Sequence, residues 1–436
     1  MSRIRHPLVA VAAAVLLSLP WVGIWATGSV GSLSTTARVA TSGVSVLAAS
    51  FLLAWGAETA EKDVPRAFAL AVLAVLAVAP EYAVDALYAW QAASDPTRAN
   101  LAVANMTGAN RILIGLGWSG IALFSIYMAS RTGAKNVVES DSRLGNYVEL
   151  DPSISTEILF LFLATVYAFF VPLGGGIDAV DFVVLVGLYL AYIAVIIGGD
   201  VEEHDDQVGV PAYFQQWPRS LRVPVVLVLF GYSGFLILTA VEPFAHGLEL
   251  LGLQFGIPEF FMIQWIAPLA SESPELIVTA YLVNKARATA AFNALISSKL
   301  NQWTLLVGTL VLVYSIALGS YGALPFDQKQ SAEIWLTAAQ SFFALTILVN
   351  FRISVAEAVT LLVLFASQVI VEFVLIRTLP EATAEQYSIW LLLGFSVVYI
   401  VVGAALLARR VEDVQRVARI TVAKIRGDPG PVVAGD

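Results

Sequence analysis

The chain has 436 residues, of which 58% are hydrophobic and 13% are charged, so most of it is expected to lie in lipid. The formal net charge of −9 is not gathered into a basic patch, which excludes nucleic acid as a partner. The sequence has no cysteine, which excludes disulfides, thiolate metal sites and cysteine catalysis.

Apolar stretches recur along the chain with short polar connections between them. A helix needs about 20 apolar residues to cross the hydrocarbon layer, and the pattern predicts an all-α integral membrane protein with about 12 transmembrane helices. The predicted spans lie near residues 8–28, 35–57, 64–91, 99–129, 154–173, 179–198, 222–245, 257–283, 288–319, 331–350, 355–377 and 386–409. The first resembles a signal peptide, but its apolar run is longer than a signal core, which favours a retained helix.

The positions of Lys and Arg predict the orientation, because these residues concentrate in cytoplasmic loops. With a cytoplasmic N-terminus, four of them fall outside (Arg38, Arg98, Lys329 and Arg377), two fall inside the membrane (Arg111 and Lys299), and the others fall on the inner side. We therefore expect both termini in the cytoplasm and the protein in the plasma (inner) membrane.

Two segments of the sequence resemble each other. VPRAFALAVLAVLAVAPEYAVDALYAW (64–90) and IPEFFMIQWIAPLASESPELIVTAYLV (257–283) align Pro80-Glu81 with Pro274-Glu275, and Asn105 then aligns with Asn293. A repeat of five spans, an odd number, places its second copy in the membrane with the opposite orientation. The sequence therefore predicts two inverted five-helix repeats plus one extra helix at each end.

The repeats define the expected organisation of the chain. The predicted parts are an extra N-terminal helix (1–34), a first repeat (35–199), a cytoplasmic acidic linker (200–221), a second repeat (222–377), an extra C-terminal helix (378–409) and a basic cytoplasmic tail (410–436). The linker has no EF-hand spacing and is interpreted as a solvated loop. The tail is basic and amphipathic, as expected for a helix on an anionic leaflet.

The two Pro-Glu pairs are the strongest candidates for a functional site. An ionisable group at membrane depth is costly and is kept for a partner, an aqueous cavity or a function. Pro80 and Pro274 should open the backbone beside Glu81 and Glu275, and the carboxylate and freed carbonyl oxygens suit Ca²⁺ or Na⁺. The alternative is a pair of structural kinks whose acids pair with buried bases, but the matched occurrence favours a cation site.

Neighbouring polar residues extend this candidate site. Asp85 follows Glu81 by four residues and Glu272 precedes Glu275 by three, so each pair shares a helix face. Asn293, Ser297 and Asn301 form a polar stripe with a spacing of four, and in the first half only Asn105, the counterpart of Asn293, remains of it. These side chains contact a cation or serve as hydrogen-bond links between helices.

Arg111 and Lys299 occupy equivalent positions of the two repeats. Pairing with an acid between helices is favoured over a direct part in transport, so both are candidate internal charge partners. Buried carboxylates that lose a cation also bind protons more readily, because burial disfavours their charged form. Proton coupling is therefore chemically available.

SESPELIVTAYLV with FNALISSKLN, and APEYAVDALYAW with ANMTGAN, resemble the two alpha-repeats of the calcium/cation antiporter superfamily, which includes sodium/calcium and proton/calcium exchangers. The resemblance implies that Glu81 and Glu275 are the paired ion-binding glutamates. It also implies that Ser271, Ser297 and Asn301 are polar ligands. The chain resembles a divergent member, since Ala77 and Val78 stand where hydroxyl residues are expected and Glu272 replaces a hydroxyl.

The leading hypothesis is a cation antiporter that exchanges Ca²⁺, or another cation, for Na⁺ or H⁺ by alternating access. Its expected partners are membrane lipids and small inorganic cations, and no cofactor is expected beyond the transported ions. The alternative is a non-transporting membrane protein with a structural network of buried salt bridges. An enzyme is not expected, because no nucleophile motif is recognised.

Overall fold

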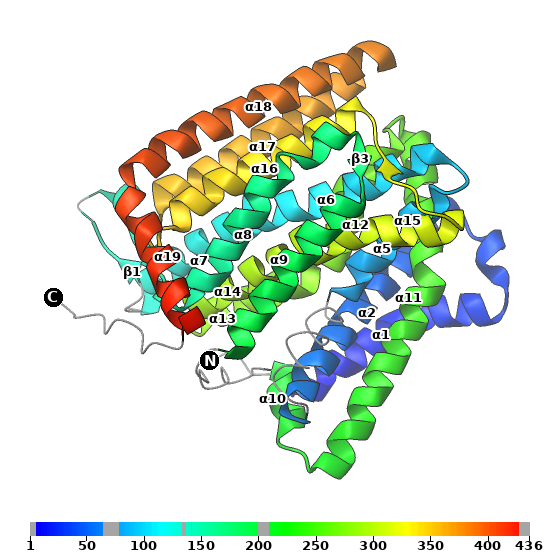
Figure 1. Cartoon of the computed structure of the whole chain (residues 1–436). Helices are drawn as coiled ribbons and strands as arrows, with labels where there is room; N and C mark the ends of the chain where they lie inside the picture. The colour runs from blue at the N-terminus through cyan, green and yellow to red at the C-terminus, as the bar shows by residue number, and fades with distance from the viewer. Residues whose placement is uncertain (1–5, 64–77, 133–136, 141, 199–208, 427–436) are drawn as a thin grey trace. The chain divides into compact units, whose positions relative to one another are not determined.

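The computed structural model describes residues 6–63, 78–132, 137–140, 142–198 and 209–426 (Figure 1). Within these residues, ten helices are long and apolar enough to cross a membrane, which agrees with an all-α membrane protein. Of the other two predicted spans, 64–91 falls partly outside the described residues. The span 257–283 is divided into two helices, α12 (Glu259–Ser271) and α13 (Ser273–Asn284).

The chain forms two compact units, and each unit takes segments from both halves of the sequence. The first unit comprises residues 1–88 and 202–274, and the second comprises 89–201 and 275–436. Helix α5 (Ala79–Gln91) begins in the first unit and ends in the second.

The first unit is built around two long helices that pack side by side. Its elements are α1 (Pro7–Ala26), η1 (Ser29–Ser32), α2 (Thr35–Ala60), η2 (Glu61–Asp63), α10 (Gly209–Gln215), α11 (Arg219–Phe255) and α12. Gly43 and Gly56 of α2 lie against the rings of Phe244 and Phe230 of α11, where a Cβ atom would collide. The missing side chains therefore let α2 and α11 approach closely.

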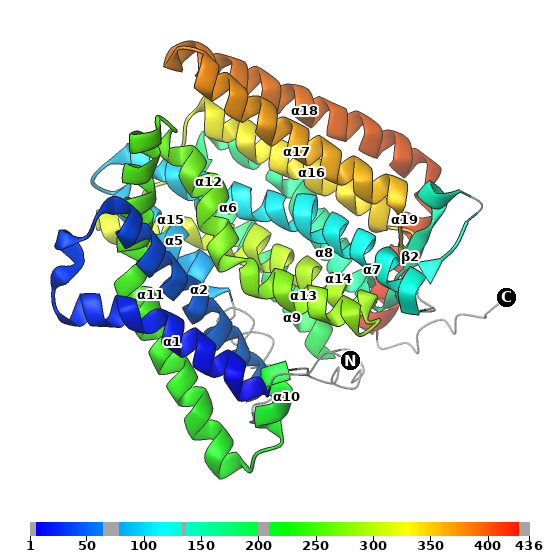
Figure 2. The same cartoon turned by 180° about the vertical axis from the view of Figure 1, so that it is seen from behind.

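Helix α13 begins at the end of the first unit and continues in the second, which also holds the remaining helices. They are η4 (Pro96–Arg98), α6 (Ala99–Ile112), η5 (Leu113–Trp118), α7 (Ser119–Thr132), η6 (Arg143–Gly145), η7 (Pro152–Ile154), α8 (Ser155–Ala168), η8 (Val171–Gly174), α9 (Ala179–Gly198), α14 (Ala288–Asn301), η9 (Gln302–Leu306), α15 (Val307–Leu318), α16 (Gln328–Leu348), α17 (Val355–Thr378), α18 (Glu381–Arg409) and α19 (Val411–Arg426). Helix α18 lies along both α16 and α17 (Figures 1 and 2).

Two segments of the second unit have the same succession of elements. In each, an α-helix continues through a π-helix into another α-helix, as α6–η5–α7 and α14–η9–α15. The two segments run antiparallel. Lys299 bonds to Asn110, whereas Leu295, one turn before Lys299, lies against Gly117, two turns after Asn110. π-Helices are rare and often accompany functional sites.

Short strands, which the sequence analysis did not predict, close two loops of the second unit. The strands β1 (Val137–Val138), β2 (Tyr147–Glu149) and β5 (Arg352–Ser354) form one antiparallel sheet, and β3 (Gly176–Ile177) pairs with β4 (Leu324–Pro325). The predicted polar connection 130–153 therefore contains β1 and β2, and β2 pairs with β5, the strand that precedes α17.

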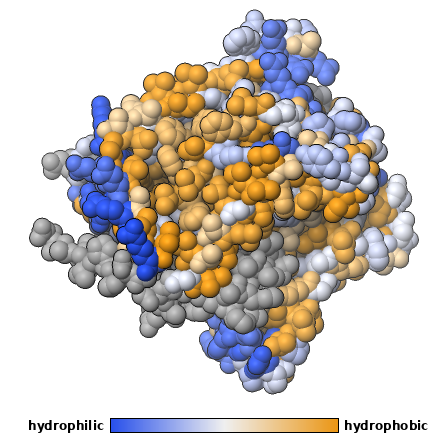
Figure 3. All heavy atoms as spheres, viewed as in Figure 1, coloured by the Kyte–Doolittle hydropathy of each residue, from blue (hydrophilic) through white to orange (hydrophobic). Residues whose placement is uncertain are grey.

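Apolar and hydrophilic residues lie on different parts of the surface in Figure 3. Large apolar side chains are exposed on α9 and α18, including Val183, Leu190, Val397 and Val401, as expected for a face in contact with lipid. Helix α19 is hydrophilic in the same view, and it packs on α8 with Val417 and Thr421 buried. The predicted tail helix is thus present, and its binding to an anionic leaflet stays a prediction.

Candidate functional site

The first Pro-Glu pair lies at the start of a helix. Helix α5 begins at Ala79, so Pro80 and Glu81 belong to its first turn. Glu81 is 3% exposed, and Asp85, one turn later, is fully buried. The sequence predicted a break beside Pro80, but residues 64–77, which precede it, lie outside the described residues.

The second Pro-Glu pair also lies at the start of a helix. Helix α12 ends at Ser271 and α13 begins at Ser273, so Glu275 belongs to a first turn just as Glu81 does. Glu272, at the junction, is fully buried. The first turn of a helix has free backbone N–H groups and a partial positive charge, which stabilise a carboxylate in the absence of a cation.

Glu275 contacts the next helix through a serine that the sequence analysis did not select. The hydroxyl of Ser298 donates to Glu275 Oε1 at 3.0 Å, and Gln302 of η9 contacts Ser298 at 3.4 Å. The sequence analysis had chosen the adjacent Ser297, but the hydroxyl that bonds Glu275 is that of Ser298. Successive residues of a helix differ by about 100° in direction, so adjacent serines face different neighbours.

The other candidate residues divide between the two units. Asp85, Ser271 and Glu272 belong to the first unit with Glu81, whereas Asn105, Asn293, Ser297, Asn301, Arg111 and Lys299 belong to the second with Glu275. Asn105 and Asn301 are buried. The Ser271 hydroxyl bonds Pro268 of its own helix, and no described residue bonds Asn293 Oδ1.

The two internal bases both contact neighbouring helices. Lys299 Nζ donates to the backbone carbonyl and the side-chain oxygen of Asn110, at 3.2 and 3.1 Å, and lies over the ring of Trp303. Arg111 forms an ion pair with Glu333 of α16 and donates to Gln368 of α17. The geometry therefore agrees with pairing between helices for Arg111.

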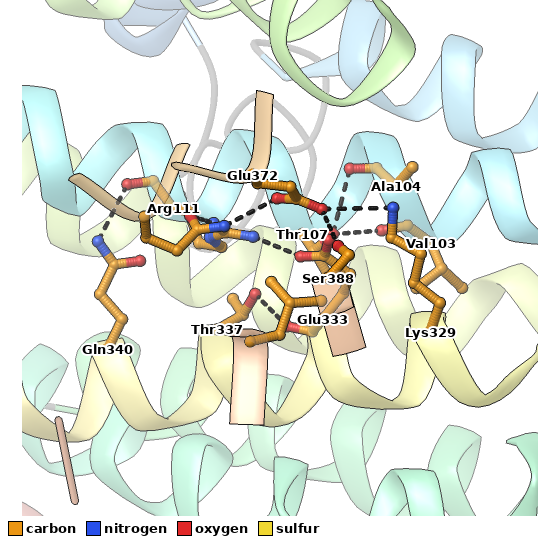
Figure 4. Close-up of polar contacts among 12 residues, drawn as sticks. Val103, Ala104, Thr107, Arg111, Lys329, Glu333, Thr337, Gln340, Glu372 and Ser388 are labelled. Atoms are coloured by element: carbon orange, nitrogen blue, oxygen red, sulfur yellow. Dashed lines mark hydrogen bonds and ion pairs between the residues drawn. The ribbon is translucent and has the colours of Figure 1, made fainter. Parts of the chain in front are cut away.

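A buried polar network continues from Arg111 across α16, α17 and α18 (Figure 4). Gln368 donates to Glu372. Glu372 also accepts a hydrogen bond from the Ser388 hydroxyl at 2.6 Å and forms an ion pair with the Lys329 ammonium at 3.3 Å. The predicted span began at residue 331 and left Lys329 in the preceding loop, which is wrong, since Lys329 lies in the first turn of α16 and is buried; its position toward the outer side stays a prediction. Its charge is compensated by Glu372, which makes burial possible.

Further buried acids were also missed. Glu157 accepts from Tyr192 at 3.3 Å, Asp181 accepts from Tyr167 at 2.9 Å, and Glu249 accepts from Tyr88 at 2.9 Å. Among the described residues, no group of three or more His, Asp or Glu side chains is arranged to hold a metal ion. The missed acids lie in or next to predicted spans. The expectation that an ionisable group at membrane depth has a partner or a function, which selected Glu81, could therefore have found them.

These observations define an integral multi-pass membrane protein with buried acids and bases in its spans. The family described as "Sodium/calcium exchanger protein" matches residues 11–198 and 225–374 of the chain. The chain belongs to this family, which confirms the resemblance to the calcium/cation antiporters. No curated protein sequence matches the chain.

Solved structures agree with this assignment. The H⁺/Ca²⁺ exchanger CAX is 42% identical, with a TM-score of 0.84 over 96% of this chain and 98% of that one. The Ca²⁺/H⁺ antiporter protein YfkE is 17% identical, with a TM-score of 0.55 over 84% of this chain and 99% of that one. The sodium–calcium exchanger NCX_Mj is 16% identical, with a TM-score of 0.50 over 77% and 97%. The last two show likeness of fold alone.

Proposed function

We propose that this protein exchanges Ca²⁺ for protons across a membrane by alternating access, with the carboxylates of Glu81 and Glu275 as ligands of the transported cation. The observation that carries the proposal is the matched pair of glutamates, each in the first turn of a helix and each directly after a proline, with Glu81 buried and Glu275 partly buried. Hard carboxylate oxygens suit Ca²⁺, and such a group at membrane depth marks an ion pathway.

Protons are the proposed coupling ion for two reasons. Ala77 and Val78 stand where the exchanger repeats have hydroxyl residues, so the first half offers fewer neutral oxygen ligands of the kind that suits Na⁺. The structure that is 42% identical is that of an H⁺/Ca²⁺ exchanger. Two carboxylates are neutralised equally by one Ca²⁺ or by two protons, so the same pair can hold either cargo in turn.

The antiparallel course of α6–η5–α7 and α14–η9–α15 supports the inverted repeat. Inverted repeats provide two similar conformations, open to opposite sides, which is the basis of alternating access. We further propose that both termini are cytoplasmic and that the protein resides in the inner membrane, in line with the distribution of Lys and Arg.

One observation favours the alternative of a non-transporting protein. The charges of Arg111, Lys329, Glu333 and Glu372 balance within their own network, without a transported ion. That alternative predicts no flux under any gradient, whereas an exchanger predicts Ca²⁺ flux that follows the coupling ion.

The test is ⁴⁵Ca²⁺ uptake into liposomes that contain the purified protein, under a proton gradient, a Na⁺ gradient or no gradient. We expect uptake to follow the proton gradient and to be lost in Glu81→Gln and in Glu275→Gln. The matched control is Glu412→Gln, an exposed glutamate of α19, which should leave uptake unchanged. Uptake that survives both substitutions contradicts the site, and uptake driven by Na⁺ alone contradicts the coupling ion.

A further inference from the structure

A second buried glutamate of the first unit is linked to the helix of Glu81. Glu249 of α11 is 5% exposed, and its Oε1 accepts a hydrogen bond from the hydroxyl of Tyr88 on α5 at 2.9 Å. Its other oxygen, Oε2, lies 3.4 Å from Nδ1 of His246, one turn earlier on α11. Glu249 thus connects His246 of its own helix with Tyr88 of α5.

Tyr88 shares a helix face with the candidate cation ligands. Glu81, Asp85 and Tyr88 follow one another at intervals of four and three residues on α5, the spacing of neighbours along one face. All three are buried. At 1.5 Å per residue, Glu81 and Tyr88 are separated by about 10 Å along the helix axis, with Asp85 between them.

His246 lies at the exposed end of this series. Its side chain is 55% exposed, whereas that of Glu249 is 7% exposed. Helix α11 has 37 residues, and at 1.5 Å per residue it is about 55 Å long, well beyond the roughly 30 Å of the hydrocarbon layer. The predicted span ended at residue 245, so the hydropathy of the sequence places His246 at the boundary of the apolar layer.

We propose that His246, Glu249 and Tyr88 form a proton route to Asp85 and Glu81, by which the coupling proton reaches the candidate cation site. This inference rests on the proposed function. Each member binds and releases a proton. A proton taken up by His246 passes to the Glu249 carboxylate. The protonated carboxyl of Glu249 then donates to the Tyr88 hydroxyl, reversing the direction of their hydrogen bond, as Tyr88 releases its own proton to the carboxylate of Asp85.

The chemistry of the route suits a proton better than Ca²⁺. Ca²⁺ takes six to eight oxygen ligands, as a general rule, whereas this series offers an imidazole, one carboxylate and one neutral hydroxyl. Charged groups on the elements packed against α11 include Arg38 of α2, whose side chain lies beside Gly247, and Glu259 at the start of α12. Glu242 lies two turns before Glu249 on α11 and is exposed.

The test compares two activities of the protein in liposomes: Ca²⁺ uptake driven by a proton gradient, and exchange of ⁴⁵Ca²⁺ for unlabelled Ca²⁺, which moves no net protons. Glu249→Gln keeps an acceptor for Tyr88 but cannot titrate. We expect it to slow the proton-driven uptake by about tenfold or more, since a positioned proton-transfer group contributes about 10²- to 10⁴-fold. The Ca²⁺-for-Ca²⁺ exchange should be retained, and the matched control, Glu242→Gln, should change neither rate.

Tyr88→Phe is the second variant, for use if Glu249→Gln does not fold, and it should give the same selective loss. Proton-driven uptake that is unchanged in these variants overturns the proton route, and so does an equal loss of both activities. A wild-type protein that shows no proton-driven uptake refutes the proposed function itself, and the two failures are thereby distinguished.

Discussion

Replacing Arg111 by methionine should destabilise the second unit strongly. The side chains of Arg111 and Glu333 are each 1% exposed, so the substitution leaves a buried carboxylate without its counter-charge. Breaking a buried ion pair by removing one partner costs about 3–5 kcal/mol. Gln368 also loses the guanidinium that donates to it. We therefore expect Arg111→Met to lower the free energy of unfolding by about 3–5 kcal/mol.

The assay is denaturant unfolding of the purified protein in detergent. The control is Arg352→Met, because Arg352 pairs with Glu149 at 3.5 Å and both side chains are about half exposed. An exposed pair contributes about 0–1 kcal/mol, so this variant should unfold almost as the wild type does. The double variant Arg111→Met with Glu333→Gln should recover much of the loss, since it removes the uncompensated charge.

The reasoning is refuted if Arg111→Met is no less stable than the Arg352→Met control. It is also refuted if the double variant loses the sum of the two single losses, because the charges would then not be coupled.

Two further substitutions test local geometry. Ser298→Ala removes the hydroxyl that donates to Glu275. It should weaken Ca²⁺ binding by about 10- to 150-fold, since a hydrogen bond to a charged group contributes about 1.5–3 kcal/mol. Calorimetric titration measures the Kd, and an unchanged Kd contradicts a part for this contact in the site. Gly115→Ala places a Cβ against the ring of Phe365 and should lower the free energy of unfolding, measured with denaturant, by about 1–3 kcal/mol. The control Gly120→Ala adds a Cβ in open space and should leave the stability unchanged. Equal effects of the two substitutions would argue against the close packing of η5 and α17.

Hydropathy predicted the membrane helices well. The span 179–198 coincides with α9, and the predicted spans near 35–57 and 355–377 differ from α2 and α17 by a few residues at most. This success follows from the bilayer, because a helix must keep about 20 apolar residues in the hydrocarbon and the sequence shows that length directly. The strands β1 to β5 have no such signal, because each is only two or three residues long.

The candidate site was predicted less completely. The Pro-Glu pairs were found by their repetition, but a mid-span kink was expected where α13 begins a new helix, since a proline suits either position. Ser297 was chosen by a spacing of four, and the contact with Glu275 comes from Ser298. A spacing of four predicts which residues share a helix face, but it does not predict which neighbouring helix that face contacts.

The charged network was missed for a different reason. Lys329 adjoins a predicted span and was assigned to a loop, because hydropathy counts its charge without knowing its partner. Its partner Glu372 is more than forty residues away in the sequence. Pairing over such a separation is a property of the packed helices, and a single sequence does not show it.

The central claim is that the carboxylates of Glu81 and Glu275 hold Ca²⁺ or protons in turn. Calorimetric titration of the purified protein with Ca²⁺, in buffers of different ionisation enthalpy, counts the protons released as Ca²⁺ binds. We predict that protons are released on binding, and that Glu275→Gln reduces both the release and the affinity. Ca²⁺ binding with no proton release would contradict the account.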